Sequence, residues 1–386
     1  MRSKIGLIIV FAAFLILPTV LYGAAYRHID HENRENREYA SFPELSKGNY
    51  EKVPGELEAY YNDRVPFKNQ FKAMRTAIDT KLQPYESKYA WIRMTPLVLR
   101  GEDGWFFYMP SVEGEDAVDD YLGLNRYTQE EMAQYAEKMQ QISDYYAAQG
   151  ITFVFLIAPG KENIYTEYMP ESYPAKGEIT RFEEFTAYLQ EHNPSVHVIY
   201  PKANLQDRKD VCELYFKKDS HWNKAGAYLA VKSVMDSIDE KAMPELADIE
   251  PVISEVRNGG DLTDILGITG KEADDEVIQL KNLAPEVTVT EIAGGHSVSD
   301  APDQRKCLIL GDSFSPVLYS VMKHTLGEVW ITNKTGECKE ILESKDYKPD
   351  ILIWEVAERY SNRMDWPDVL MGITDQEQQS EGFEAR

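Results

Sequence analysis

From Thr128 onward, two kinds of apolar pattern alternate along the chain. Short continuous apolar runs are typical of strands buried on both faces of a parallel sheet, whereas apolar residues that recur every three or four positions predict amphipathic helices. The strands predicted in this way are 151–158, 196–200, 306–310, 328–332 and 349–356, and the helices are 128–150, 179–191 and 223–238. Strands that alternate with helices predict an α/β fold with a doubly wound, mostly parallel sheet.

Local capping and turn signals fix some of the boundaries. Thr128–Glu131 is a capping box that begins a helix, and Gly150 ends that helix. Earlier in the chain, Asp103–Gly104 lies between apolar residues and predicts a β-hairpin within Arg100–Tyr108. Apolar residues at helical spacing within 60–82 predict one more helix before the hairpin.

The N-terminus has the pattern of a membrane anchor. The basic residues Arg2 and Lys4 flank the start of an apolar run at 5–25, and about 20 apolar residues is the length that crosses a bilayer. By the positive-inside rule the basic end stays in the cytoplasm, which predicts that the chain after Tyr26 lies outside it. Small residues at 22–25 leave a cleavable signal peptide, and so a secreted protein, as the alternative.

These patterns divide the chain into four parts. Residues 1–26 are the expected signal anchor or transmembrane helix, and 27–80 are a juxtamembrane linker with an N-terminal helix. Residues 81–373 form the expected catalytic α/β domain, and 374–386 form a polar tail.

Composition and charge narrow the choice of partners. The 386 residues carry a formal net charge of −24, and so acidic a surface repels the phosphates of nucleic acids, which excludes them as partners. The three cysteines, Cys212, Cys307 and Cys338, are too few for a disulfide framework. Cys307 opens an apolar strand and is most simply a small buried residue. Nothing in the sequence demands a Cys212–Cys338 pair.

Ser313 is the first candidate for chemistry. It follows a predicted buried strand in the stretch Gly311–Asp312–Ser313, and in α/β sheets sites form at the carboxyl ends of strands. Backbone N–H groups at such a turn suit both an activated serine and the oxyanion of an acyl-transfer intermediate. The alternative, a helix cap after a strand, is common and is favoured if this stretch is taken alone.

Asp219 and His221 are the second candidate. In an extended segment, residues two apart project to the same side, so the carboxylate can hold one imidazole nitrogen and leave the other as a general base. A surface turn and a metal site are the alternatives, but no third ligand stands out, so no metal is expected. Together with Ser313 these residues supply a nucleophile, a base and an orienting acid, as in serine hydrolases and acyltransferases.

The order of these motifs resembles the SGNH-hydrolase-like family of the alginate O-acetyltransferase and DHHW type. The Asp219–Asn223 pattern "DSHWN" precedes Gly311–Ser313, whereas ordinary SGNH hydrolases place the serine first. Five further blocks fit the family in consistent order over nearly the whole chain after the expected anchor: "ENREYASFPEL", "RGEDGWFFY", "APGKENIYTEYMP", "GGDLTDILG" and "DILIWEVAERY".

This resemblance implies a Ser313–His221–Asp219 catalytic triad. It also implies that Tyr319, six residues after the serine, lies near the active site. Lys161 in "PGK" and Arg359 in "ER" belong to family blocks whose roles are structural or substrate-facing. Asn223 would cap the next helix. These four, Tyr319, Lys161, Arg359 and Asn223, are the expected substrate-binding residues.

The resemblance further implies acetylation of hydroxyls on an extracytoplasmic polysaccharide, without a cofactor. A membrane-bound O-acyltransferase would pass acetyl groups to the chain, which would sit in the cell membrane with its body outside. Two alternatives stay open. The same triad serves a carbohydrate esterase if water takes the acyl group, and a non-catalytic partner in a polysaccharide assembly or export complex would retain the triad as a relic.

Overall fold

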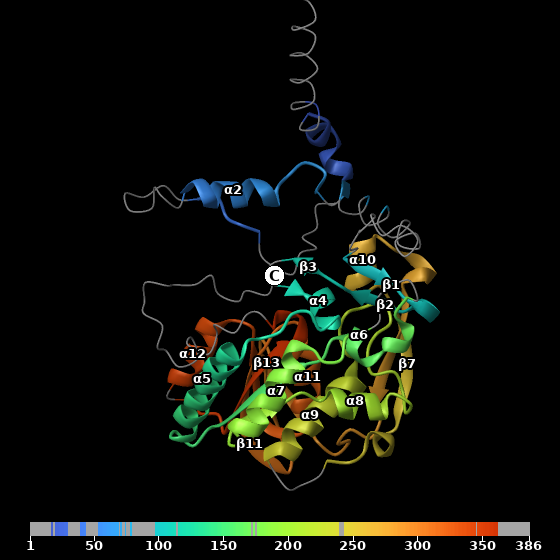
Figure 1. Cartoon of the computed structure of the whole chain (residues 1–386). Coiled ribbons are helices and arrows are strands. Elements are labelled where there is room, and N and C mark those ends of the chain that lie inside the picture. The colour runs from blue at the N-terminus through green and yellow to red at the C-terminus, as the bar shows by residue number, and fades with distance from the viewer. Residues whose placement is uncertain are drawn as a thin grey trace, which may run out of the picture. The chain divides into compact units, whose positions relative to one another are not determined.

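The computed structural model describes residues 97–361 except 113–114, 171–172, 174–175, 239–242 and 345. It also describes residues 17, 20–29, 39–43, 53–68, 70–71, 74 and 78. The chain divides into two compact units, Met1–Asp79 and Thr80–Ala385 (Figure 1). The predicted polar tail, 374–386, lies outside the described residues.

The described part of the first unit contains a short 3₁₀ helix, η1 (Tyr26–His28), and α2 (Val53–Asp63). Asp63 at the end of α2 accepts the backbone N–H of Ala40 at 2.7 Å. Of the helix predicted within 60–82, residues 60–63 belong to α2, and the described residues 68, 70, 71, 74 and 78 are helical, whereas the rest of 69–82 lies outside the described residues. Among the described residues no helix is both long and apolar enough to span a bilayer, and most of the predicted anchor at 1–26 is not described.

The second unit is built on a seven-stranded sheet with the order β6-β5-β13-β11-β12-β10-β9. The five strands expected from the sequence pair in parallel, and β9 and β10 extend the sheet with antiparallel pairing. The strands are β5 (Thr152–Ala158), β6 (His197–Ile199), β9 (Val289–Ala293), β10 (His296–Ser299), β11 (Asp303–Leu310), β12 (Leu326–Thr332) and β13 (Ile351–Ala357). The predicted α/β fold with a mostly parallel sheet is confirmed.

Helices cover both faces of this sheet. One face packs against α9 (Lys224–Ile238) and α11 (Ser315–Met322), and the other against α5 (Gln129–Ala147), α7 (Arg181–His192) and α12 (Thr335–Glu343) (Figure 1). The right-handed crossovers of parallel strands require this split. The capping box predicted at Thr128 is present, with Glu131 reciprocating, and α7 begins with a second one at Thr180.

Smaller elements surround the carboxyl ends of the strands. The predicted hairpin is present as β1 (Val98–Arg100) and β2 (Phe106–Tyr108), paired antiparallel. A second antiparallel pair, β7 (Pro251–Asn258) and β8 (Asp274–Leu280), was not expected. The remaining elements are β3 (Ser111–Val112), β4 (Glu115–Asp116), α4 (Ala117–Tyr121), α6 (Lys161–Ile164), α8 (Lys202–Arg208), α10 (Asp261–Leu266), and the 3₁₀ helices η2 (Glu102–Gly104), η3 (Thr166–Tyr168), η4 (Leu246–Ile249), η5 (Gly270–Ala273) and η6 (Glu358–Tyr360).

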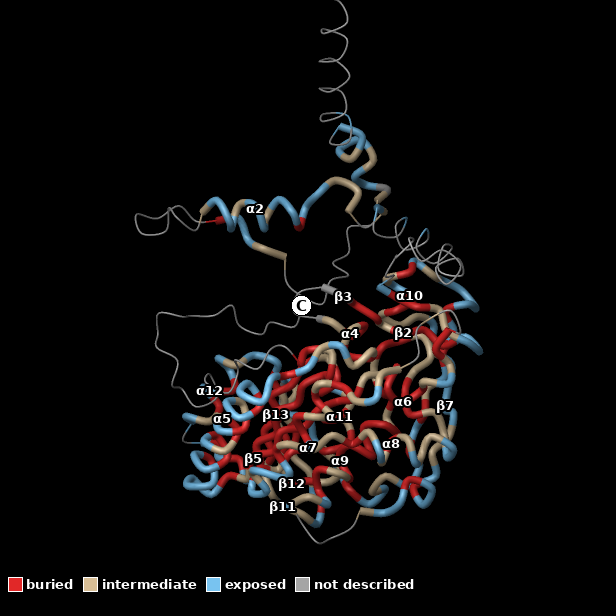
Figure 2. The backbone as a smooth tube through the Cα atoms, viewed as in Figure 1, coloured by how far each residue is buried: buried red, intermediate tan, exposed pale blue. Residues whose placement is uncertain are grey.

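The core lies between the central strands and their helices (Figure 2). All seven residues of β13 are buried, which explains why these strands appear in the sequence as continuous apolar runs. All three cysteines are free, and Cys307 and Cys338 are fully buried. The interpretation of Cys307 as a small buried residue is therefore correct.

The tip of β11 requires a glycine. A Cβ atom built on Gly311 would lie 2.6 Å from both Glu355 Oε2 and Ser315 Cβ, and both neighbours are fully buried. We therefore expect Gly311→Ala to lower the free energy of unfolding by about 1–3 kcal/mol through overpacking. Denaturant unfolding measures this loss.

Gly336 in α12 is the matched control, because nothing lies within 4 Å of a Cβ built there. Because Gly336 is exposed in the first turn of α12, Gly336→Ala should leave the free energy of unfolding unchanged or raise it, by less than about 1 kcal/mol. Equal effects of the two substitutions would show that β11 does not approach Glu355 as described.

Candidate active site

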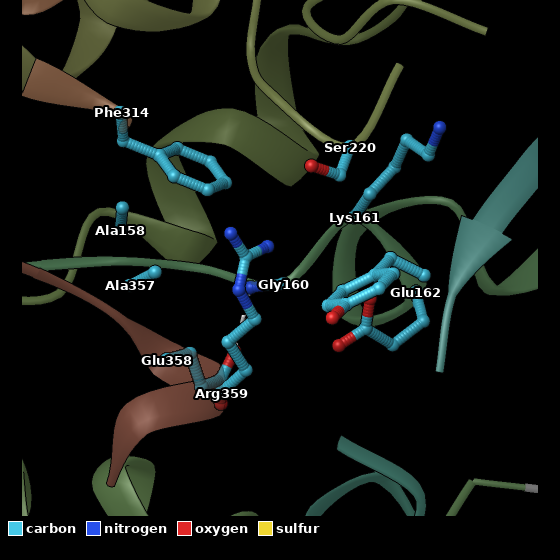
Figure 3. A pocket seen from close by; sticks show the side chains of 10 residues that line it. Ala158, Gly160, Lys161, Glu162, Ser220, Phe314, Ala357, Glu358 and Arg359 are labelled. Atoms are coloured by element: carbon cyan, nitrogen blue, oxygen red, sulfur yellow. Dashed lines mark hydrogen bonds between the residues drawn. The ribbon is translucent and has the colours of Figure 1, made fainter. Parts of the chain in front are cut away.

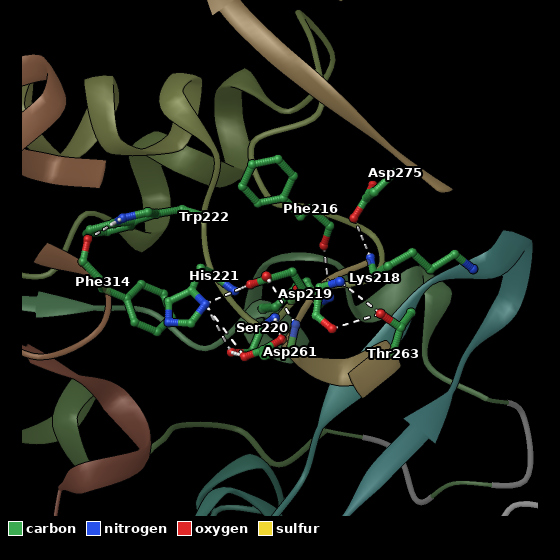
Figure 4. A network of polar contacts seen from close by, with 12 residues as sticks. Phe216, Lys218, Asp219, Ser220, His221, Trp222, Asp261, Thr263, Asp275 and Phe314 are labelled. Atoms are coloured by element: carbon green, nitrogen blue, oxygen red, sulfur yellow. Dashed lines mark hydrogen bonds and ion pairs between the residues drawn. The ribbon is translucent and has the colours of Figure 1, made fainter. Parts of the chain in front are cut away.

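Asp219 and His221 lie on a tight loop between α8 and α9. An isolated antiparallel bridge between Tyr215 and Trp222 closes this loop, and the N–H of Phe216 donates to the carbonyl of His221 at 3.2 Å. Within the loop, Asp219 Oδ1 accepts the backbone N–H of His221 at 3.0 Å and lies 2.7 Å from His221 Nδ1. The predicted carboxylate–imidazole pair is thus present (Figure 4).

The second oxygen of Asp219 is also engaged. Arg257 on β7 lies 3.0 Å from Asp219 Oδ2, and the backbone N–H of Asp261 donates to the same atom at 3.3 Å. Burial disfavours the carboxylate, but the hydrogen bond and charge of His221 and the charge of Arg257 outweigh it and hold the pKa of Asp219 well below its usual value. Asp219 is therefore an anion at neutral pH.

His221 is held by its neighbours on both sides. Burial disfavours the imidazolium, but the hydrogen bond and charge of Asp219, aided by Asp261, raise the pKa of His221 above its usual value. The ring of Phe314 lies 4.7 Å from the imidazole, centroid to centroid. His221 Nε2 is buried and has no hydrogen-bond partner among the described residues, so it is available to move a proton.

Ser313 follows β11 in a turn that Asp312 organises. Asp312 Oδ1 accepts the N–H of Phe314 at 2.9 Å, and Oδ2 accepts the N–H of Ala357, the last residue of β13, at 2.7 Å. Burial and the charge of Asp312 raise the pKa of Glu355, whose Oε2 accepts the N–H of Asp312 at 3.1 Å. Asp312 is thus a turn residue, and Ser313 beside it is half-buried.

One contact ties the serine turn to the histidine loop. The indole N–H of Trp222 donates to the carbonyl of Phe314 at 3.0 Å, and the two rings pack edge to face. The loop that carries His221 and the turn that carries Ser313 are therefore held together. Ser313 Oγ does not donate to His221 Nε2 here, and such bonds are often long or absent without substrate.

A pocket opens beside this contact at the carboxyl ends of β5 and β13. Its lining includes Phe314, Ser220, Glu162 and Arg359. Figure 3 shows the Arg359 guanidinium pointing into the space between Phe314 and Ser220. Burial and the charge of Glu358 raise the pKa of Glu162 to about 8, so this carboxyl is mostly protonated at neutral pH. Arg359 therefore stands where the sequence resemblance expects a substrate-facing residue.

Lys161 also lines the pocket, and its side chain has a structural role in addition to the predicted substrate-binding one. Its ammonium donates to the backbone carbonyls of Phe216, Lys217 and Asp219 at 2.8–3.2 Å, and in Figure 3 it points away from the centre of the pocket. Burial lowers the pKa of Lys161 to about 8, against the raising influence of nearby carboxylates. Lys161 is a structural residue that holds the loop carrying Asp219.

Asn223 and Tyr319 also differ from the expectation. Asn223 is buried, donates to Glu213 O at 2.6 Å and accepts the N–H groups of Ala225 and Gly226, so it is the helix cap of α9 and not a substrate ligand. Tyr319 on α11 donates its hydroxyl to Glu291 on β9 at 2.7 Å. Neither residue lines the pocket.

Three residues of the site were missed in the sequence. Arg257 pairs with Asp219. Asp275 on β8 accepts the N–H groups of Lys217 and Lys218 at 3.1 and 2.7 Å. Asp261 accepts both the N–H and the hydroxyl of Ser220 (Figure 4). Only Asp261 carried a signal, because it falls in the block "GGDLTDILG". The other two are distant in sequence and have no motif of their own.

Among the described residues, Asp219, His221 and Asp261 form a group that could hold a metal ion, because one possible ligand atom of each lies within 4.8 Å of the others. Their bonding does not favour one. The imidazole Nδ1 is hydrogen-bonded to Asp219, and Arg257 already supplies a cation to the same carboxylate. The set fits an orienting carboxylate and a general base better than a metal centre.

Comparison with known proteins assigns the family. The family model of the SGNH hydrolase-like domain of acetyltransferase AlgX matches residues 98–358. This range carries every residue of the site described above except Arg359, which follows its last residue. The chain therefore belongs to this family. The resemblance seen in the sequence is therefore confirmed. Membership of this acetyltransferase family, together with the names of the curated relatives, supports the prediction that the chain is an O-acetyltransferase.

Curated relatives carry consistent names. A probable alginate O-acetylase AlgJ of Pseudomonas syringae pv. tomato is 24% identical over 78% of this chain and 77% of its own length. The corresponding protein of Pseudomonas putida is also 24% identical, over 56% of this chain, but the match spans only about half, 51%, of that relative. A solved DHHW family protein from Eubacterium siraeum is 13% identical, with a TM-score of 0.42 over 72% of this chain and 98% of its own.

A substitution separates a structural from a substrate-binding role for Lys161. Because Lys161→Met leaves three carbonyls without their charged donor, we expect the free energy of unfolding to fall by about 2–3 kcal/mol. Denaturant unfolding measures this, with Lys339→Met in α12 as the exposed control, expected to change stability by less than about 1 kcal/mol. A rise in KM at unchanged stability would restore the substrate-binding role.

Proposed function

We propose that the chain acetylates hydroxyls of a cell-surface or secreted polysaccharide through an acyl-Ser313 intermediate. The observation that carries this proposal is the buried Asp219–His221 pair, whose Nε2 has no partner among the described residues, packed against the residue that follows Ser313. Family membership supplies the acetyl group as the transferred unit. The names of the curated relatives supply a polysaccharide, alginate, as a model acceptor.

In the first step Ser313 Oγ attacks the carbonyl carbon of an acetyl ester, and its proton passes to His221 Nε2. The tetrahedral intermediate then expels the donor alkoxide, which takes the proton back from His221, and acetyl-Ser313 remains. Asp219 stabilises the imidazolium that exists between these two transfers, because it is held as an anion. The Ser313 N–H is the proposed oxyanion donor.

In the second step a sugar hydroxyl replaces the donor. His221 Nε2 accepts the hydroxyl proton, the sugar oxygen attacks the acetyl carbon, and the proton returns to Ser313 Oγ as the serine leaves. Water in place of the sugar gives net hydrolysis by the same steps. Transfer therefore depends on a sugar being held in the pocket, where Arg359 and the protonated Glu162 offer hydrogen-bond donors.

Location and partners form part of the same proposal. The basic and apolar pattern of residues 1–26 supports a single-pass anchor in the cell membrane, with the α/β domain outside the cytoplasm. A membrane-bound O-acyltransferase would then deliver acetyl groups across the bilayer to the pocket.

The triad can be tested on the full chain in detergent with p-nitrophenyl acetate, with and without an acetyl-free oligosaccharide. We expect Ser313→Ala and His221→Ala each to lower kcat/KM for acetate release by at least about a thousandfold. Acetyl groups on the oligosaccharide, detected by mass spectrometry, identify a transferase, and release to water alone identifies an esterase. Activity should rise with pH through a midpoint above 6.5, because the raised pKa of His221 keeps it protonated at lower pH.

The controls for the triad are Ser320→Ala and His192→Ala. Ser320 donates only to a carbonyl within α11, and His192 is exposed at the end of α7. Both should keep wild-type activity. If Ser313→Ala and His221→Ala retain wild-type ester cleavage, or if the wild type neither cleaves nor transfers, the triad proposal fails and a non-catalytic partner is the better description.

Arg359 is the proposed substrate-facing cation. Arg359→Ala should lower kcat/KM for acetyl transfer by about ten- to a hundredfold, since it removes a charged donor from the pocket. Arg359→Lys keeps the charge and should recover part of the loss. Arg208→Ala, which removes an exposed ion pair with Glu245, is the control and should leave kinetics unchanged. Unchanged kinetics in Arg359→Ala would remove this residue from the site.

A further inference from the structure

Asp261 contacts the histidine loop through several atoms. Its Oδ1 accepts the backbone N–H of Ser220 at 2.7 Å, and its Oδ2 accepts the Ser220 hydroxyl at 2.5 Å. Its own N–H donates to Asp219 Oδ2 at 3.3 Å. Because Ser220 lies between Asp219 and His221 in the chain, Asp261 holds the middle of the pair (Figure 4).

Asp261 also faces the imidazole directly. Its Oδ2 is 3.6 Å from His221 Nδ1, and Ser220 Oγ is 3.4 Å from the same nitrogen. The proton on Nδ1 thus lies beside two carboxylates, with Asp219 at 2.7 Å as the nearer acceptor. If Asp261 only fixed the loop in place (a loop tie), its two hydrogen bonds to Ser220 would be enough. Its position beside His221 Nδ1 indicates a second role.

The fold holds Asp261 firmly in this place. A Cβ built on Gly260 would lie 2.7 Å from Lys218 O and 2.8 Å from Asp219 Cβ, so only a glycine allows the two backbones to approach this closely. On the other side of Asp261, Leu262 and Leu266 of α10 pack with Val98 and Phe106 of the β1–β2 hairpin. Asp261 is therefore anchored from both directions.

The charges around His221 show why a second carboxylate matters. The charged groups that act directly on the imidazole are Asp219 on the loop and Asp261 on α10, which favour its positive form, and Arg359 on η6, which disfavours it. Around the two carboxylates lie Arg257 on β7, Lys161 on α6 and a further carboxylate, Asp275 on β8. Without Asp261, only Asp219 would act directly against Arg359 at the ring.

We propose that Asp261 is a positioning residue of the active site, a second carboxylate that orients His221 through Ser220 and stabilises its imidazolium. No bond to Asp261 forms or breaks during the reaction. It acts while His221 holds the serine proton, when the positive charge on the ring is greatest. This role rests on the proposed function, in which His221 accepts that proton.

The test uses Asp261→Asn in the full chain, which keeps the shape of the side chain and removes its charge. We expect the NMR titration midpoint of His221 to fall by about one pH unit. We also expect kcat for acetate release to fall about tenfold, because a shift of one pH unit and a tenfold change in rate correspond to the same free energy. KM should change less than about twofold, because Asp261 does not line the pocket. The midpoint of the pH–rate profile should fall with that of His221.

Two variants separate positioning from simple loop stability. Asp248→Asn removes an exposed carboxylate from η4 and should leave the His221 titration unchanged. Ser220→Ala keeps the Asp261 charge and removes the hydroxyl, so it should lower kcat while leaving the His221 midpoint within about 0.3 pH units of the wild type.

The outcomes are distinct from those of the proposed function. If Asp261→Asn leaves the His221 midpoint unchanged, or lowers kcat only in proportion to a fall in folded protein, Asp261 is a loop tie and this inference is wrong. If the wild type is inert towards the ester, the proposed function fails, and the NMR titration in wild type and Asp261→Asn still decides whether the second carboxylate acts on the imidazole.

Discussion

Keeping a carboxylate ionised in a buried place is the constraint on which this site depends. Burial alone would neutralise Asp219, and a neutral acid could not stabilise an imidazolium. Arg257 and His221 supply the opposing interactions, and Arg257 comes from β7, an element outside the central sheet. The small β7–β8 pair therefore belongs to the candidate site, because it supplies the charge that keeps Asp219 ionised.

A second constraint is that the loop carrying Asp219 has few regular backbone partners of its own. Its carbonyls are taken by the Lys161 ammonium from α6, and its N–H groups by Asp275 and Asp261. Charged side chains thus replace the backbone pairing that a strand or helix would provide.

The sequence predicts the layered sheet well because the central strands β5 and β13 are buried on both faces and appear as nearly unbroken apolar runs. It predicts less of the periphery. β7 has a largely exposed burial pattern, so it carries no strong periodic signal, and α10 and η5 separate it from its partner β8. The Asp219–His221 pair is local and could be predicted, whereas Arg257 and Asp275 reach the site only through tertiary packing.

The corrected residues show why a motif alone does not assign a role. Lys161 and Asn223 lie in the expected blocks, yet the bonding of each is used up by backbone groups of the loop and helix that they support. Arg359 differs because its guanidinium points into the pocket. Residues in one motif can therefore serve substrate or scaffold, and the deciding property is whether the polar end of the side chain is already committed to the backbone. By that criterion Lys161 and Asn223 serve the scaffold, whereas the guanidinium of Arg359 faces the pocket.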